Sequence, residues 1–216
     1  MESEQAAAPL DPTLDRGLVG RGEEPDRVEY IDLDFRATDG TVAGFVRLTV
    51  LANQRACWFW TVLRTPQHSH VAVIEPDLPM PSRSLEFRTS GLWVDLVCED
   101  PFTHYAVGLE AFGLLLDEPG DAVGHRVPVG YDLEWESVPG TGYPLDCVTH
   151  GEILVADEVI ELDGHGSRTH RWSSQFDIVD PRRPPVDATD PHAAVPIAGR
   201  GVYRRQLGGP GEDVVD

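Results

Sequence analysis

Three side chains near the end of the chain could do chemistry together. Arg168, His170 and Trp172 alternate with other residues in the segment RTHRW. Alternate residues of an extended strand point to the same face, so a cation, a titratable ring and a large aromatic group would project together. Inside a closed sheet they would form the polar part of an apolar cavity. On a face exposed to solvent they would have no particular role, so their functional role depends on the fold.

The segments that would position these residues have the pattern of β-strands. Residues 129–136 (VGYDLEWE) alternate apolar with acidic side chains or glycine, which is typical of a strand with one solvated face. Residues 57–63 (CWFWTVL) are nearly all apolar, as in a strand covered on both faces. Asp39-Gly40 predicts a hairpin, and Gly164-His165-Gly166 is interpreted as a connection between two strands. About ten short strands without a helix predict an all-β antiparallel barrel or strongly curved sandwich.

Composition sets the expected limits of the folded part and the classes of partner. We expect one domain at 27–179, with mostly disordered tails at 1–26 and, rich in proline and glycine, at 180–216. The net charge of −20 argues against nucleic acid and anionic membranes as partners. The three cysteines form no CxxC motif. No signal peptide or apolar span is recognised, so a soluble cytoplasmic protein without membrane insertion is expected.

The chain lacks convincing motifs for a metal or an organic cofactor. His68, His70 and Glu75 resemble the first half of a cupin metal motif, but the glycines that flank this motif are missing. Two surface histidines at a hairpin are the simpler interpretation. No nucleophile elbow, phosphate loop or dinucleotide fingerprint is present. We therefore expect neither a metal nor another cofactor.

The tryptophans have two possible roles. They either fill space in the core or shape a lumen for a flat or polyene-like apolar ligand. In the second case a desolvated Asp95 would have a raised pKa and could protonate an alkene, and Asp95 or Glu134 would pair with Arg168. A solvated outer face remains the alternative for Asp95 and Glu110. The candidate catalytic residues are His170, Arg168 and Asp95, and the candidate ligand-binding residues are Trp58, Trp60, Trp93, His104, Glu110, Trp135 and Trp172.

Several segments together resemble a known superfamily. They are residues 29–35, GLWVDLVCEDPFTHYAVGLEAFGLLLDEP at 91–119, PVGYDLEWE at 128–136 and ELDGHGSRTHRW at 161–172. The chain is similar over about residues 28–173 to the lipocalin-like carotenoid hydratase/AttH superfamily, the group around hydroxyneurosporene synthase, which has many actinobacterial members. The family's closing motif usually reads Gly-x-Gly-x-Arg-Asp-x-Ser-Trp-Gly. This chain matches it at Gly164, Gly166, Arg168, His170 and Trp172, but has Thr169 in place of the Asp and Ser173 in place of the final Gly.

The resemblance implies a lipocalin-like (calycin) barrel that binds an apolar isoprenoid- or polyketide-like molecule. Some members carry out hydration or cyclisation without a cofactor, and others only bind lipids. The family commonly has two such halves, whereas this chain has room for one, so a homodimer could replace the missing half. Three readings stay open: a small enzyme of secondary metabolism, a non-catalytic carrier or protein-interaction barrel, and a structural role in which Arg168 packs over Trp172.

Overall fold

The protein is built from antiparallel strands. The computed structural model describes residues 28–51, 55–68, 70–81, 84–116, 124–140 and 144–173, with side chains as far as residue 170. These residues contain ten strands and no helix, which confirms the expected all-β class. The expected tails at 1–26 and 180–216 lie outside the described residues. The strands are β1 (Val28–Ala37), β2 (Ala43–Leu51), β3 (Ala56–Arg64), β4 (His70–Pro79), β5 (Leu85–Arg88), β6 (Leu92–Asp100), β7 (His104–Leu116), β8 (His125–Ser137), β9 (Leu145–Val155) and β10 (Glu158–Ser173).

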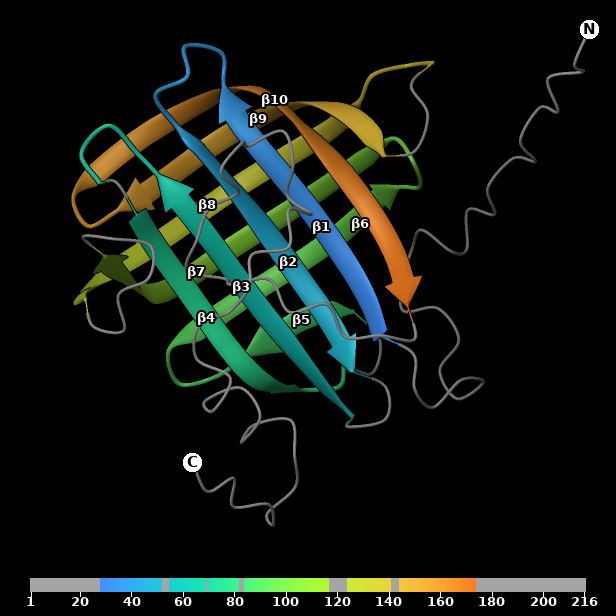
Figure 1. Ribbon diagram of the computed structural model, residues 1–216, viewed down its shortest axis with the longest axis horizontal. Helices are drawn as coiled ribbons and strands as arrows, with labels where there is room; N and C mark the ends of the chain where they lie inside the picture. Colours follow the sequence, from blue (N-terminus) through green and yellow to red (C-terminus); the bar gives the residue numbers. More distant parts are fainter. Residues whose placement is uncertain are drawn as a thin grey trace, which may run out of the picture.

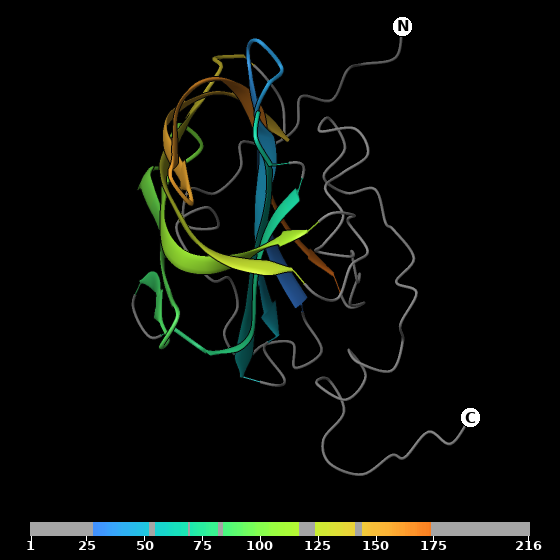
Figure 2. The same ribbon diagram turned by 90° about the vertical axis from the view of Figure 1, so that its left-hand side faces the viewer.

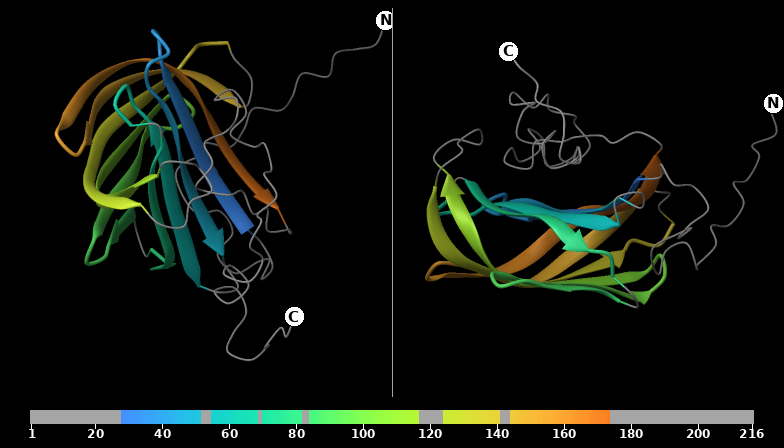
Figure 3. Two further views of the ribbon diagram at one scale, coloured as in Figure 1. Left: turned by 60° about the vertical axis from the view of Figure 1, so that its left-hand side comes forward. Right: turned by 90° about the horizontal axis from the view of Figure 1, so that it is seen from below.

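Most of the strands form a closed, flattened ring. The sheet runs in the order β4-β3-β2-β1-β10-β9-β8-β7-β6-β5, and β4 also pairs with β7. Strands β1 to β4 form one layer that crosses in front of β6 to β9 (Figure 1). Seen from below, the two layers lie one above the other with β10 passing between them (Figure 3). The arrangement is consistent with the predicted lipocalin-like fold.

Strand β10 joins the layers because two glycines let it approach β1. A Cβ atom at Gly164 would lie 2.0 Å from the carbonyl oxygen of Arg36, and one at Gly166 would lie 1.9 Å from that of Asp34. No other residue type fits at such distances. The interpretation of residues 164–166 as a connection between strands is therefore wrong: they lie within one strand of sixteen residues. The strong bend of β9 and β10 is visible in Figure 2.

The apolar side chains form two clusters, one inside the ring and one on the outer face of β1 to β4. The inner cluster takes alternate residues from all ten strands, among them Leu33, Leu48, Phe59, Val107 and Leu133. The outer cluster comprises Val28, Tyr30, Phe45, Leu51, Trp58, Trp60, Val62, Ala72 and Leu116. Strand β3 contributes to both clusters, which confirms that its CWFWTVL segment is covered on both faces.

A buried ion pair lies within the outer cluster. Asp32, Arg47 and Trp60 are direct cross-strand neighbours on β1, β2 and β3. The Arg47 guanidinium donates from Nε and Nη2 to the two Asp32 carboxylate oxygens, the second at 2.9 Å. Arg47 Cζ also lies 5.6 Å from the ring centroid of Tyr30 and 5.8 Å from that of Trp60. Since both charges are almost completely buried, their pairing offsets part of the cost of burying them.

We expect Arg47→Met to lower the free energy of unfolding by about 3–5 kcal/mol, because Asp32 would keep a buried charge without its guanidinium partner. The double variant Asp32→Leu/Arg47→Met should lose much less, since it removes both charges. Urea unfolding measures both values. Arg88→Met, which breaks the exposed pair with Glu86, is the control and should leave the free energy of unfolding nearly unchanged. Equal losses in the single and double Arg47 variants would contradict this account.

Candidate functional site

Two of the polar residues singled out in β10 point into the ring. Arg168 and His170 are the cross-strand neighbours of Leu33 and Ile31, both of which belong to the inner cluster. Directly paired residues of an antiparallel sheet share a face, so both polar side chains are on the inside. Arg168 is 1% exposed and His170 6%. The backbone of Trp172 pairs with Glu29, but its side chain lies outside the described residues.

Arg168 contacts a tyrosine on the opposite part of the ring. Its Nη2 donates to the Tyr105 hydroxyl, and its Cζ lies 3.4 Å from the centroid of the Tyr105 ring. The prediction that Arg168 pairs with Asp95 or Glu134 is wrong, because these two carboxylates occupy outward positions of β6 and β8. A phenol beside a guanidinium is a strong hydrogen-bond donor, and the contact joins β10 to β7.

His170 is paired with a buried glutamate. The distance from His170 Nε2 to Glu29 Oε1 is 2.6 Å, and both side chains are under 5% exposed. Imidazole and carboxylate at this distance can share and transfer a proton. Glu29 was not among the candidates. The signal in the sequence is its position, because it alternates with Ile31, Leu33 and Phe35 where an apolar residue would be expected.

Trp135 also lies inside, as part of the inner cluster. Its Nε1 donates to the carbonyl oxygen of Asp34 at 2.7 Å, and its ring meets that of Phe35 edge-on with 6.1 Å between centroids. Farther along β8, burial raises the pKa of Tyr131, and the Thr61 side chain partly opposes this. The Thr149 hydroxyl, also buried, has no hydrogen-bond partner among the described residues. The interior thus carries a few polar groups on an apolar lining.

The structure does not bring the remaining candidates to this interior. Trp58 and Trp60 lie in the outer cluster, because β3 turns its other face, with Cys57 and Phe59, toward the inside. On β6, Leu92, Val94 and Leu96 point inward, so Trp93 and Asp95 point outward. Burial raises the pKa of Asp95, with repulsion from Glu86 adding to the effect and Arg88 opposing it.

Strand β7 likewise presents its candidates outward. His104 and Glu110 alternate with Tyr105, Val107 and Leu109, which belong to the inner cluster. Glu110 is exposed, in agreement with the alternative of a solvated face. Residues 104–116 form one continuous strand. The face that this strand shows to the interior of the ring is apolar except at Tyr105.

Asp34 is a titratable group at the seam between β1 and β10. Its carboxylate accepts hydrogen bonds from Ser167 N at 2.9 Å and Ser167 Oγ at 2.6 Å. Burial nevertheless raises the pKa of Asp34 to about 6; the Ser167 hydrogen bonds lower it, Asp32 raises it and His165 lowers it. The folded protein therefore takes up a proton here at a pH where the unfolded chain, with an ordinary aspartate pKa near 3.8, does not.

We expect this proton uptake to stabilise the fold as the pH decreases from about 7 to about 4, by at most about 3 kcal/mol. Asp34→Asn keeps a hydrogen-bonding group beside Ser167 but does not titrate. The variant should therefore be the more stable of the two at pH 7.5, and its advantage should shrink toward pH 4.5. Urea unfolding of both proteins across this range measures the difference. An advantage that is constant with pH would contradict the raised pKa.

Comparison with known proteins gives one family match. Residues 22–175 match the family described as Domain of unknown function (DUF7064). No curated protein matches the chain. The solved structure of CghA with Sch210972 is 14% identical with a TM-score of 0.40, and the match covers 69% of this chain and 46% of that one. A second CghA structure is 13% identical with a TM-score of 0.39, and covers 71% of this chain and 47% of that one.

The chain spans about half the length of these two solved structures. Nothing helical in the described part of the chain has the length and hydropathy of a transmembrane segment. The specific resemblance to the carotenoid hydratase superfamily stays a prediction. The family match, in contrast, covers most of the chain and includes all ten strands. This protein therefore belongs to the family of the domain of unknown function DUF7064.

Proposed function

We propose that the ring binds an apolar, isoprenoid- or polyketide-like small molecule in its interior, next to Arg168, Tyr105, His170 and Glu29. The observation that carries this proposal is the burial of these four groups on a face that is otherwise apolar. A few polar groups on an apolar lining are the usual composition of a small-molecule site, in which the polar groups fix the orientation of the ligand.

The energetic cost of these groups supports a functional role. Burying charged or ionisable side chains is costly, and packed apolar residues of similar volume would often be equally or more stable. A purely structural ring could therefore place leucine or phenylalanine at positions 168 and 170. The two polar pairs instead leave a cation, a phenol, an imidazole and a carboxylate on the inner face.

The same groups could catalyse hydration or cyclisation without a cofactor. The His170–Glu29 pair can deliver a proton to one carbon of an alkene and, as a base, take one from the water that adds to the other carbon. Tyr105, polarised by Arg168, can donate a hydrogen bond to a carbonyl oxygen and make that substrate more electrophilic. Much of the rate in a cyclisation would come from holding a flexible chain in its reactive conformation.

A non-catalytic carrier is the second candidate. It is favoured by the hydrogen bonds themselves, because Arg168 already contacts Tyr105 and His170 already contacts Glu29, as in a rigid lining. The chain also has Thr169 where the closing motif of the carotenoid hydratase superfamily usually has an Asp, which favours a carrier as well. A carrier should bind its ligand with a dissociation constant that is unchanged between about pH 5 and pH 8, and should form no product.

The expected homodimer, cytoplasmic location and lack of nucleic-acid binding stay predictions.

We expect all-trans-retinol, an isoprenoid alcohol whose absorption overlaps tryptophan emission, to quench the fluorescence of the buried Trp135. Arg168→Met should weaken binding by about tenfold, through loss of one charge-assisted contact to the hydroxyl group. A second variant, His170→Ala, is compared with His125→Ala, which removes an exposed histidine of β8. The His125→Ala control should bind retinol with the affinity of the wild type. Circular dichroism confirms the fold of each variant. The absence of saturable quenching by retinol, or identical affinity in wild type and Arg168→Met, would overturn interior binding.

Catalysis is tested separately, by incubation with unsaturated isoprenoids in heavy-oxygen water. The enzyme hypothesis predicts that wild type incorporates the label and that His170→Ala binds retinol but incorporates none, because the proton relay with Glu29 is lost. Mass spectrometry of the extracted lipid gives the result. Binding in the wild type with neither label incorporation nor a new isomer of the substrate, separated by chromatography, would leave the carrier as the function.

A further inference from the structure

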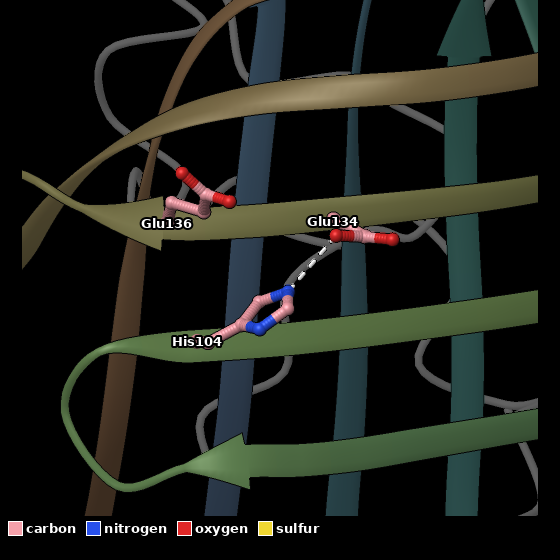
Figure 4. A group of neighbouring side chains, drawn as sticks. All are labelled: His104, Glu134 and Glu136. Atoms are coloured by element: carbon pink, nitrogen blue, oxygen red, sulfur yellow. Dashed lines mark hydrogen bonds and ion pairs between the residues drawn. The ribbon is translucent and has the colours of Figure 1, made fainter.

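A cluster of metal-binding residue types lies on the outer face of β7, β8 and β9, away from the interior site. His104, Glu134 and Glu136 each offer a donor atom, and these atoms all lie within 4.8 Å of one another. Figure 4 shows the His104 ring and the Glu134 carboxylate turned toward each other across neighbouring strands. His150, on β9, reaches the same carboxylate from the other side.

The strand register explains why these groups converge. Glu136 is the direct cross-strand neighbour of His104, and Glu134 is that of His150. Glu134 therefore lies between the two histidines. The distance to its Oε2 atom is 2.9 Å from His104 Nε2 and 3.3 Å from His150 Nε2. The Glu134 oxygen thus contacts one ring nitrogen from each neighbouring strand, while the donor atoms that all lie within 4.8 Å of one another are those of His104, Glu134 and Glu136.

The position of the cluster would allow an ion to enter and to keep a water ligand. The side chains of His104, Glu134 and His150 are 31%, 42% and 45% exposed. The net charge of −20 also favours cations near the surface.

We propose that His104, Glu134 and Glu136 form a binding site for a divalent transition metal, with zinc as the best match. Imidazole and carboxylate groups are both zinc ligands, and a site with three protein ligands takes water in the fourth position. His150, which contacts Glu134 at 3.3 Å, would replace that water if its ring turned toward the ion. A hard cation such as Mg²⁺ prefers oxygen ligands only and fits this donor set poorly. The site is independent of the proposed interior function.

The test uses the full chain, stripped of metal with a chelator and titrated with ZnCl₂ in a calorimeter. We expect one zinc per chain, with at least about tenfold weaker binding in His104→Ala and in Glu134→Gln. His125→Ala removes an exposed histidine outside the cluster and should bind like the wild type. Co²⁺ should give the intense visible absorption of tetrahedral coordination, and this absorption should be lost in His104→Ala.

Three results would overturn the site. They are no saturable zinc binding by the wild type, unchanged affinity in both cluster variants, and equal affinity for Mg²⁺ and Zn²⁺, which would indicate general attraction to an acidic surface. The substituted side chains are partly exposed on the outer face, so the variants are expected to fold, and circular dichroism checks this. Retinol binding by the same variants should remain normal, which separates this proposal from the interior function.

Discussion

The close approach of β1 and β10 is the constraint on which the rest of the structure depends. At Gly164 and Gly166 the backbone of β1 occupies the space that a Cβ atom would need, so these two positions accept only hydrogen. This contact lets one long strand leave the layer of β8 and β9 and join β1, which closes the ring. The Asp34 carboxylate holds the same two strands together by accepting two hydrogen bonds from Ser167. Its backbone carbonyl oxygen accepts a hydrogen bond from Trp135 Nε1 of the opposite layer.

The bend of β10 also determines the interior chemistry. Because the strand continues through the glycines, Arg168 and His170 remain on the face that carries Leu162 into the inner cluster. Pairing with β1 then places Glu29 within reach of His170, while the curvature of the ring brings Tyr105 to Arg168. The polar groups inside the ring are thus a consequence of the same geometry that closes it.

The two sides of the ring differ in their outer surfaces. On β1 to β4 the outer face is buried and holds the Asp32–Arg47 pair among aromatic rings. On β7 to β9 the outer face is partly exposed and carries histidines and carboxylates, with Glu134 between His104 and His150. Strand alternation is the same in both layers, so the difference lies in which residue types occupy the outward positions. One outer surface is suited to packing and the other to polar ligands.

The sequence alone determined that the chain forms strands and which residues of a strand share a face, because alternation with period two is a local property of a strand. It did not show that residues 164–166 continue one strand, because that depends on the close approach of β1. It predicted the all-β class and the common face of Arg168 and His170. It could not show which face was inward where both are apolar, so Trp58 and Trp60 were assigned to the wrong side. Nor could it predict the Glu29–His170 contact, which joins residues 141 positions apart. Only the tertiary structure decided these points, since register and ring closure depend on pairing between distant strands.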